Sequence, residues 1–481
     1  MKSAPSIARL ERDCTASAGR PLRVCHLGKY YPPAAGGIET HVRTLAQAQA
    51  ELGLDVSVLC MNHERGPTRR ENDGPVRVTR FRPLVSAAKI DVCPLLVKEL
   101  ALTNADVLHL QVPNPTMILA ILIARPRRPI VVTYQSDLVR QRLRARAFRP
   151  LERLAYRQVR AILPTSPTYA AGSEFLRGYE DRTHVLPMGI DLEPYLNPSP
   201  RTLAAADEIR RRYGPGPIWL GCGRMIYYKG FHNAIRALPH CPGTLLLVGD
   251  GPDLLPLVDQ ARRLNVLDRV HFLGGMPYQK IVPYYHAATA FWFPSNARSE
   301  AFGIVQLEAM ASGCPVINTS IPHSGVAWVS KHDESGLTVP MDDPEALAAA
   351  ATRLASDPDL RARLSTTARA RARDEFDQRT MAERSIAVYE RVLSRRTASR
   401  PPSLVRLEDW VDDMHAIAAD AAPTNGLVEA AQVDARAEDR EINPLREKRR
   451  ASRSSRASLI GAGAANVSRF FQNPATVVPA S

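Results

Sequence analysis

The stretch that decides the fold is SNARSEAFGIVQLEAMASG, Ser295 to Gly313. It holds two carboxylates, Glu300 and Glu308, and its second half has the apolar spacing of a helix that starts after Gly303. Glu300 would precede that helix, and Glu308 would lie about 8 Å along its axis at about 1.5 Å per residue. The first amides of a helix lack internal partners and face outward at its positive end. The stretch therefore predicts an anion site between two hydrogen-bond acceptors, which suits a pyrophosphate with a hydroxylated ring at each end. The alternative is a surface helix with two solvated glutamates.

Two cations follow another predicted strand, IWLGC, in the loop GRMIYYKG. Arg224 offers a planar fork to phosphate oxygens, and Lys229 offers a point charge. Beyond the carboxyl end of a strand, both could neutralise a departing nucleoside diphosphate. Taken alone, an arginine and a lysine at this spacing also occur by chance, as does the glycine-rich turn VGDGP (Val248–Pro252).

Length and composition indicate a globular protein of more than one domain. A chain of 481 residues exceeds one ordinary core, and 45% hydrophobic residues support globular folding. No apolar run approaches the roughly 20 residues of a membrane span, and the amino terminus lacks the apolar core of a secretory signal. The seven cysteines form no CxxC or His/Cys cluster. We therefore expect reduced thiols, a cytoplasmic location and no zinc site.

The charge balance favours a polyanionic partner. The formal net charge is +14, and the predicted helix Leu138–Ala161 carries eight arginines against one glutamate. Its interleaved apolar residues are typical of a helix that docks on an anionic membrane, which here would be the inner face of the plasma membrane. A solvated helix is the alternative, and Pro150 should kink or split it in either case. We expect no nucleic-acid partner, because no binding module or aromatic platform is recognised.

Strands alternate with helices along most of the chain, which predicts an α/β fold with parallel sheets covered on both faces. A strand from Arg23 to Tyr31 leads through Gly36 and Gly37 into a helix, so backbone amides could approach a phosphate or sugar there. A plain tight turn is the alternative. Other strand ends carry polar residues that would line a ligand crevice or cap helices: Gln111, Gln135, Ser136 and Asp137.

Composition divides the chain into segments. We expect a disordered lead-in over residues 1–21 and a first Rossmann-like domain over 22–195. A proline- and charge-rich linker at 196–216 precedes a second Rossmann-like domain over 217–396, whose last helix could pack back on the first domain. The composition of residues 397–481 predicts a mostly disordered basic tail.

The succession of motifs is more specific than any one of them. GGIETH, LPMGID, GRMIYYKG, LLLVGDGP, RVHFLGG and SEAFGIVQLEAMASGCPVI follow one another at consistent separations. From about Arg23 to Val392 this closely resembles the family-four retaining glycosyltransferases of the GT-B fold, which implies two facing Rossmann-like domains with the nucleotide held by the second.

The resemblance also implies roles for particular residues. Glu300 would contact the transferred sugar and Glu308 the ribose, while Arg224 and Lys229 hold the diphosphate. The amides of Phe302, Gly303 and Ile304 would assist, and Gly36, Gly37 and Gln135 would bind substrate from the first domain. No metal or other cofactor is expected, because the two cations and the positive end of the helix would neutralise the diphosphate in place of a metal ion.

Two positions depart from the family pattern. Relatives often carry histidine where this chain has Gln111 and Gln135. A glutamine can hydrogen-bond but does not titrate near neutral pH. Gln135 would either orient the sugar adequately or leave an enzyme that is slower or altered in substrate.

Together these features predict a retaining hexosyltransferase that uses a GDP- or UDP-sugar and acts on a glycan or lipid-linked acceptor in polysaccharide synthesis. The segment TYQSDLVRQ is similar to bacterial surface-polysaccharide mannosyltransferases, which favours GDP-mannose. Alternatives are an epimerase or phosphorylase on the same architecture, or a catalytically degenerate scaffold that binds nucleotide or membrane.

Overall fold

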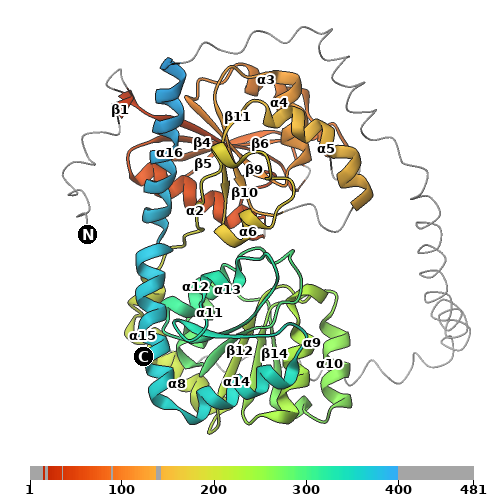
Figure 1. Ribbon diagram of the computed structural model, residues 1–481, viewed down its shortest axis with the longest axis vertical. Coiled ribbons are helices and arrows are strands. Elements are labelled where there is room, and N and C mark those ends of the chain that lie inside the picture. Colours follow the sequence, from red (N-terminus) through yellow and green to blue (C-terminus); the bar gives the residue numbers. More distant parts are fainter. Residues whose placement is uncertain are drawn as a thin grey trace, which may run out of the picture. The chain divides into compact units, whose positions relative to one another are not determined.

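The computed structural model describes residues 15–16, 20–34, 36–64, 66–87, 90–136 and 142–398. They form two α/β lobes, each built on a largely parallel sheet (Figure 1). The predictions for the tail beyond residue 398, for most of the lead-in and for Asp137 concern residues outside this range.

The first lobe contains a sheet in the order β11-β10-β9-β3-β4-β6-β5. Its strands are β3 (Arg23–Leu27), β4 (Asp55–Met61), β5 (Arg69–Asp73), β6 (Val76–Phe81), β9 (Val107–Val112), β10 (Ile130–Tyr134) and β11 (Val159–Pro164). Its helices are α2 (Gly37–Glu51), α3 (Pro94–Ala101), α4 (Pro115–Ala124), α5 (Arg142–Tyr156) and α6 (Pro167–Ala171), with a 3₁₀ turn at η1 (Glu180–Arg182). Short antiparallel pairs form between β1 (Thr15–Ala16) and β2 (Arg20–Pro21) and between β7 (Val85–Ala87) and β8 (Ile90–Val92).

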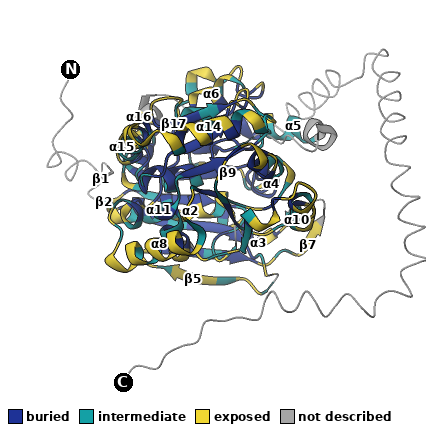
Figure 2. Ribbon diagram, turned by 90° about the horizontal axis from the view of Figure 1, so that it is seen from below, coloured by how far each residue is buried: buried dark blue, intermediate teal, exposed yellow. Residues whose placement is uncertain are grey.

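The predicted parallel sheet is confirmed, and it carries one antiparallel strand at its edge. β5 pairs antiparallel with β6, and Gly74 makes the connecting turn at a φ of +59° that favours glycine. The polar sequence RREND of β5 gave no strand signal, because an edge strand can expose most of its side chains. The interior strands β9 and β10 are buried along their whole lengths, and exposed residues lie on the surrounding helices (Figure 2).

The second lobe contains a parallel sheet in the order β14-β13-β12-β15-β16-β17. Its strands are β12 (Ile218–Cys222), β13 (Thr244–Val248), β14 (Val270–Gly274), β15 (Ala290–Phe293), β16 (Val316–Thr319) and β17 (Gly336–Val339). Its helices are α9 (Phe231–Ala237), α10 (Leu254–Arg263), α11 (Tyr278–Ala287), α12 (Val305–Ala311), α13 (Val326–Val329), α14 (Pro344–Ser356) and α15 (Pro358–Glu375), with 3₁₀ turns η2 (Tyr227–Lys229), η3 (Leu238–His240) and η4 (Leu267–Arg269). All six strands expected in this half of the chain are confirmed.

The last helix, α16 (Gln378–Ala398), returns to the first lobe. Met381, Ile386 and Tyr389 belong to the same buried cluster as apolar residues of β3, β4 and α2. Gln49 of α2 donates from its Nε2 to the Ser385 Oγ over 2.7 Å. The prediction that the final helix packs on the first domain is confirmed.

Several local expectations are corrected. The basic helix spans Arg142–Tyr156, contains Pro150 without splitting, and gives way to β11 where the sequence predicted a helix to Ala161. At the end of the expected lead-in, residues 20 and 21 form β2, and Arg20 forms an ion pair of 2.8 Å with Asp106. The proposed linker is largely helical: it holds α8 (Pro200–Tyr213), after the short α7 (Glu193–Leu196).

Among the described residues, no helix has both the length and the apolar character needed to cross a membrane. The six cysteines in this part of the chain are free thiols, and five of them are buried.

Candidate functional site

Lys229 and Glu300 form a buried ion pair beyond the carboxyl ends of β12 and β15. The Lys229 Nζ lies 2.6 Å from the Glu300 Oε2, and the two side chains are 13% and 11% exposed. Burial opposes the charge on Lys229, but the neighbouring carboxylate outweighs it and raises the pKa of the ammonium. Lys229 therefore keeps its positive charge next to the Glu300 carboxyl, at one point of the second lobe.

Glycines let the two loops that carry this pair approach each other. Gly230, at a φ of +67°, follows Lys229, and a Cβ there would overlap the carbonyl oxygen of Pro294 at the start of the Glu300 loop. The amide of Asn296 donates to the Tyr228 carbonyl over 3.0 Å. A side chain at residue 230 would force the loops apart, so the second glycine of GRMIYYKG is a packing requirement.

The VGDGP turn supports the same loop. The amide of Met225 donates to the Asp250 carbonyl over 2.9 Å, and the amide of Asp253 donates back to Met225 over 3.1 Å. A Cβ at Gly249 would overlap the carbonyl oxygen of Gly223, and one at Gly251 would overlap that of Met225. Two motifs that are weak separately thus form one interlocked structure.

Arg224 is exposed at the beginning of this loop. Its charge acts on the phenol of Tyr228: burial and Glu300 raise the pKa of that phenol, whereas Lys229 and Arg224 lower it. Both cations and the carboxylate therefore lie near one tyrosine. The structure brings Lys229 and Glu300 into contact and leaves Arg224 exposed.

Glu308 lies in α12, and burial raises the pKa of its carboxyl to about 7. Hydrogen bonds from Tyr285 and Tyr195 act in the opposite direction by stabilising the ionised form. The Tyr285 hydroxyl donates to the Glu308 Oε2 over 2.7 Å. The sequence gave no signal for either tyrosine, because both come from elements far from α12 in the chain.

The segment Phe302–Ile304 leads directly into α12, which begins at Val305. Gly303 has a φ of +80°, and a Cβ there would lie 2.7 Å from the Phe293 ring, so only glycine fits. The side chain of Phe302 is buried beside Trp328 and Phe376. Phe302 can therefore offer a ligand its backbone, while its ring serves the core.

The glycine turn of the first lobe lies beside this segment. A Cβ on Gly37 would lie 3.9 Å from the Ile304 Cδ1, and both Gly36 and Gly37 are exposed. Gly36 precedes α2 as its N-cap. The turn thus brings the amino-terminal end of a 15-residue helix close to Ile304.

Gln111 and Gln135, at two strand ends of the first lobe, contact each other. The Gln135 Nε2 donates to the Gln111 Oε1 over 3.1 Å, at the carboxyl ends of β10 and β9. Both side chains are buried. The neighbouring His109 is engaged elsewhere, with Thr133 at 2.7 Å and Tyr389 at 2.6 Å.

Sequence reasoning missed one residue that joins the site loops. Asp342, after β17, accepts hydrogen bonds from the Nδ2 atoms of Asn233, over 2.7 Å, and Asn296, over 2.8 Å. Asn296 lies on the Glu300 loop, and Asn233 lies in the helix that follows Lys229. One carboxylate therefore ties both loops together. Within the described residues, no group of three or more His, Cys, Asp or Glu side chains could hold a metal ion.

Two Rossmann-like lobes, with a buried acid–lysine pair at the strand ends of the second, define a protein of the GT-B class. Residues 35–194 match the family described as Glycosyltransferase Family 4, and residues 205–371 match Glycosyl transferases group 1. Over 359 residues, 74% of this chain and 92% of the relative, the sequence is 34% identical to the D-rhamnosyltransferase WbpZ of Pseudomonas aeruginosa. The chain belongs to this glycosyltransferase family, and the predicted family and fold are confirmed.

Further comparisons agree. The chain is 29% identical to the O-antigen chain mannosyltransferase C of Escherichia coli, with 77% of this chain and 99% of that protein covered. Among solved structures, sucrose-phosphate synthase from Thermosynechococcus elongatus aligns with a TM-score of 0.64 at 23% identity, covering 78% of this chain and all of that one. The structure of HepE from Anabaena in complex with UDP aligns with a TM-score of 0.62 at 22% identity, covering 77% of this chain and all of that one.

Proposed function

We propose that this protein is a retaining, metal-independent hexosyltransferase that uses a nucleotide sugar and acts on a glycan or lipid-linked acceptor in polysaccharide biosynthesis. The observation that carries the proposal is the buried Lys229–Glu300 pair, with Glu308 on the helix that follows. Two similar proteins are named as a rhamnosyltransferase and an O-antigen mannosyltransferase, which favours GDP-mannose as the donor over UDP-glucose.

In the proposed reaction, an acceptor hydroxyl attacks the anomeric carbon on the face from which the diphosphate departs. The bond between that carbon and the phosphate oxygen breaks, and the departing phosphate takes the hydroxyl proton. Lys229 and Arg224 stabilise the charge that develops on the leaving group. Glu300 orients the sugar hydroxyls, Glu308 accepts hydrogen bonds from the ribose, and the amides of Phe302, Gly303 and Ile304 face the phosphates. Gly36, Gly37 and Gln135 complete the substrate site from the first lobe.

A donor screen tests this proposal. The purified protein is incubated with GDP- and UDP-sugars and an extract that supplies acceptors, with and without a metal chelator. We expect transfer from GDP-mannose that survives the chelator and yields a product with the anomeric configuration of the donor. Inversion of that configuration, or dependence on a divalent metal, would refute the corresponding part of the proposal.

A second candidate is a degenerate transferase that binds nucleotide or membrane as a scaffold. The observation that favours it is the hydrogen-bonded pair Gln111–Gln135 in place of titratable histidines. The same screen separates the two candidates, because a scaffold would bind GDP or UDP without transferring or hydrolysing any donor.

We further propose that the first lobe contacts an anionic membrane, at the cytoplasmic face of the plasma membrane. Exposed apolar side chains lie on and around the β7–β8 hairpin, α3 and α4: Leu84, Val85, Val92, Leu95 and Ile123. α4 packs on α5, whose sequence is rich in arginine. Apolar residues next to basic ones favour such a surface. Co-sedimentation with anionic vesicles at low salt tests this, and failure to sediment would remove the proposal.

A further inference from the structure

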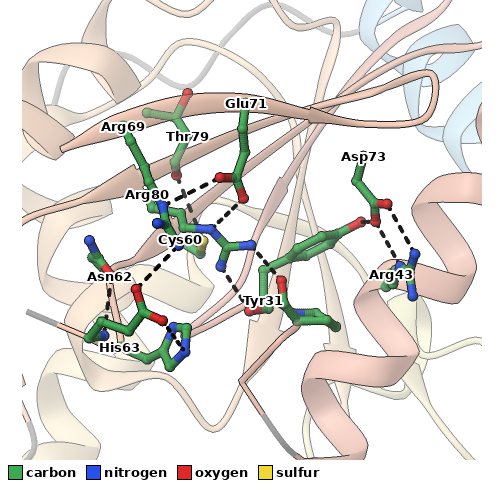
Figure 3. Close-up of polar contacts among 12 residues, drawn as sticks. Tyr31, Arg43, Cys60, Asn62, His63, Arg69, Glu71, Asp73, Thr79 and Arg80 are labelled. Carbon is green, nitrogen blue, oxygen red and sulfur yellow. Dashed lines mark hydrogen bonds and ion pairs between the residues drawn. The ribbon is translucent and has the colours of Figure 1, made fainter. Parts of the chain in front are cut away.

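Arg80 is an arginine buried in the first lobe, outside every motif that the sequence singled out. It lies in β6 and is 1% exposed. Its Nε donates to the Glu71 Oε1 over 2.7 Å, its Nη1 donates to the Tyr31 carbonyl over 2.8 Å, and its Nη2 donates to the Pro32 carbonyl. Figure 3 shows the guanidinium lying between the Glu71 carboxylate and the chain at Tyr31.

A buried charge destabilises a protein unless its hydrogen bonds are satisfied, so these partners explain what Arg80 does there. Glu71 supplies the countercharge from the neighbouring strand β5. Nη1 and Nη2 each donate to one of two successive carbonyls. The planar fork of arginine can reach both at once, whereas a lysine would bind at one point. Arg80 therefore holds the backbone of Tyr31 and Pro32.

The β5–β6 hairpin, which carries Glu71 and Arg80, also binds the side chain of Tyr31 through Asp73. The Tyr31 hydroxyl donates to the Asp73 Oδ2 over 2.8 Å, and Arg43 of α2 donates to the two Asp73 oxygens over 2.7 and 3.0 Å (Figure 3). Tyr31 precedes the glycine turn and Arg43 follows it. The β5–β6 hairpin is thus attached to the chain before and after Gly36 and Gly37.

The turn between these attachments lies against the second lobe, because a Cβ on Gly37 would lie 3.9 Å from Ile304. We propose that Arg80 is a positioning residue that fixes the Gly36–Gly37 turn against the donor-binding segment Phe302–Ile304. The inference rests on the proposed function, since it gives that turn a task in transfer. Misplacement of a substrate-facing group by about 1 Å can reduce turnover by about 100-fold, so a residue that only holds the turn can still control the rate.

The test compares Arg80→Met with Arg77→Met. Arg77 lies on the same strand, but its side chain is 61% exposed and pairs with Asp55 at a distance of 2.5 Å, so its loss leaves the turn untouched. In Arg80→Met we expect kcat to fall by about 10- to 100-fold. The affinity for GDP or UDP, measured by calorimetry, should stay within about twofold, because Lys229 and Glu308 belong to the second lobe. Amide hydrogen exchange of the peptide covering residues 31–40 should become faster in Arg80→Met alone.

The inference is overturned if Arg80→Met folds and keeps wild-type turnover, or if nucleotide affinity falls in parallel with turnover, because the residue would then be merely structural. Two milder variants decide the matter if Arg80→Met does not fold. Tyr31→Phe removes the Asp73 bond, and Arg80→Lys keeps the charge but loses the fork; unchanged exchange and turnover in both would also overturn it. Absence of transfer by the wild-type protein would refute the proposed function, while the exchange data would still test the positioning.

Discussion

The strand ends of the two lobes differ in charge. Beyond the strand ends of the second lobe lie the ion pair Lys229–Glu300 and, in α12, the carboxyl of Glu308, whose pKa burial raises to about 7. In the first lobe the corresponding positions carry Gln111 and Gln135, which hydrogen-bond each other, and buried histidines lie nearby in β3, β9 and α2. Burial lowers the pKa of His26 to about 4 and that of His41 to about 3, so both are neutral at pH 7.

This difference suggests a division of labour. Charge that develops on a departing diphosphate requires fixed charges nearby, and in the proposed reaction the second lobe would supply them. Neutral groups can orient a sugar or an acceptor without changing the electrostatic field at the leaving group. This orienting role is the one that we expect of the first lobe. Substitutions in either lobe test whether charged groups of the second lobe and neutral groups of the first do separate work.

The largest effect should follow from Glu300→Gln. The substitution leaves the buried Lys229 ammonium without its countercharge and removes a carboxylate from the proposed sugar site. We expect kcat to fall by at least about 100-fold, or about 3 kcal/mol, in steady-state assays. The control is Glu334→Gln, which breaks an exposed lysine–glutamate pair of 3.2 Å with Lys331 and should change turnover by less than about twofold. Equal activities in the two variants would remove Glu300 from the site.

The buried histidines predict a loss of stability in acid. Their folded pKa values lie below the unfolded value of about 6.5, so the unfolded state binds more protons as the pH falls from 6.5 toward 4. Burial is the main cause, and the neighbouring His26 lowers the pKa of His41 further. At pH 5 each such histidine should cost about 2 kcal/mol of unfolding free energy relative to pH 7.

His41→Leu tests this directly, because neither ring nitrogen of His41 has a hydrogen-bond partner in the described part of the chain. Denaturant unfolding should show the variant at least as stable as wild type at pH 7 and about 2 kcal/mol more stable at pH 5. The exposed His240 offers the control His240→Gln, which should follow the wild-type curve. A variant that loses stability in acid as steeply as wild type would show that His41 is not the source.

The two lobes also differ in how far the sequence alone predicted them. The motif order predicted the fold, and the alternation of apolar strands with helices predicted the six strands of the second lobe, whereas the roles of the candidate site residues stay a prediction. It missed β5, Asp342 and Tyr285, because an exposed edge strand lacks an apolar pattern, and a single aspartate or tyrosine acquires a role only through partners distant in the chain. Arg80 was missed for the same reason: it lies on the face of β6 that also carries the buried Val76 and Val78, and its partners at Glu71, Tyr31 and Pro32 are brought to it only by the fold.

Glu308 should make nucleotide binding depend on pH. In the proposed complex, ribose hydroxyls donate to the ionised carboxylate, so binding favours deprotonation and weakens as the pH falls through about 7. Between pH 8 and pH 6 we expect the affinity for GDP or UDP to fall by about tenfold in calorimetry. Glu308→Gln should flatten this profile. Tyr285→Phe should move its midpoint upward, because it removes a hydrogen bond from the ionised form. A flat wild-type profile would argue against contact between Glu308 and the ribose.

The smallest effect is expected at Gln135, where the first lobe offers a neutral hydrogen bond. Gln135→Ala should lower kcat/KM by about fivefold, or about 1 kcal/mol, because one uncharged hydrogen bond is lost. The exposed Gln279 supplies the control Gln279→Ala, which should have no effect. Gln135→His sharpens the comparison, since it places a titratable ring at this strand end. Its pH–rate profile should gain a limb near pH 6.5 that the wild type lacks. The wild type could instead already show such a limb, and Gln135→His could leave it unchanged. A titrating group elsewhere in the site would then control the rate, and the neutral side chains of the first lobe would not determine the pH–rate profile.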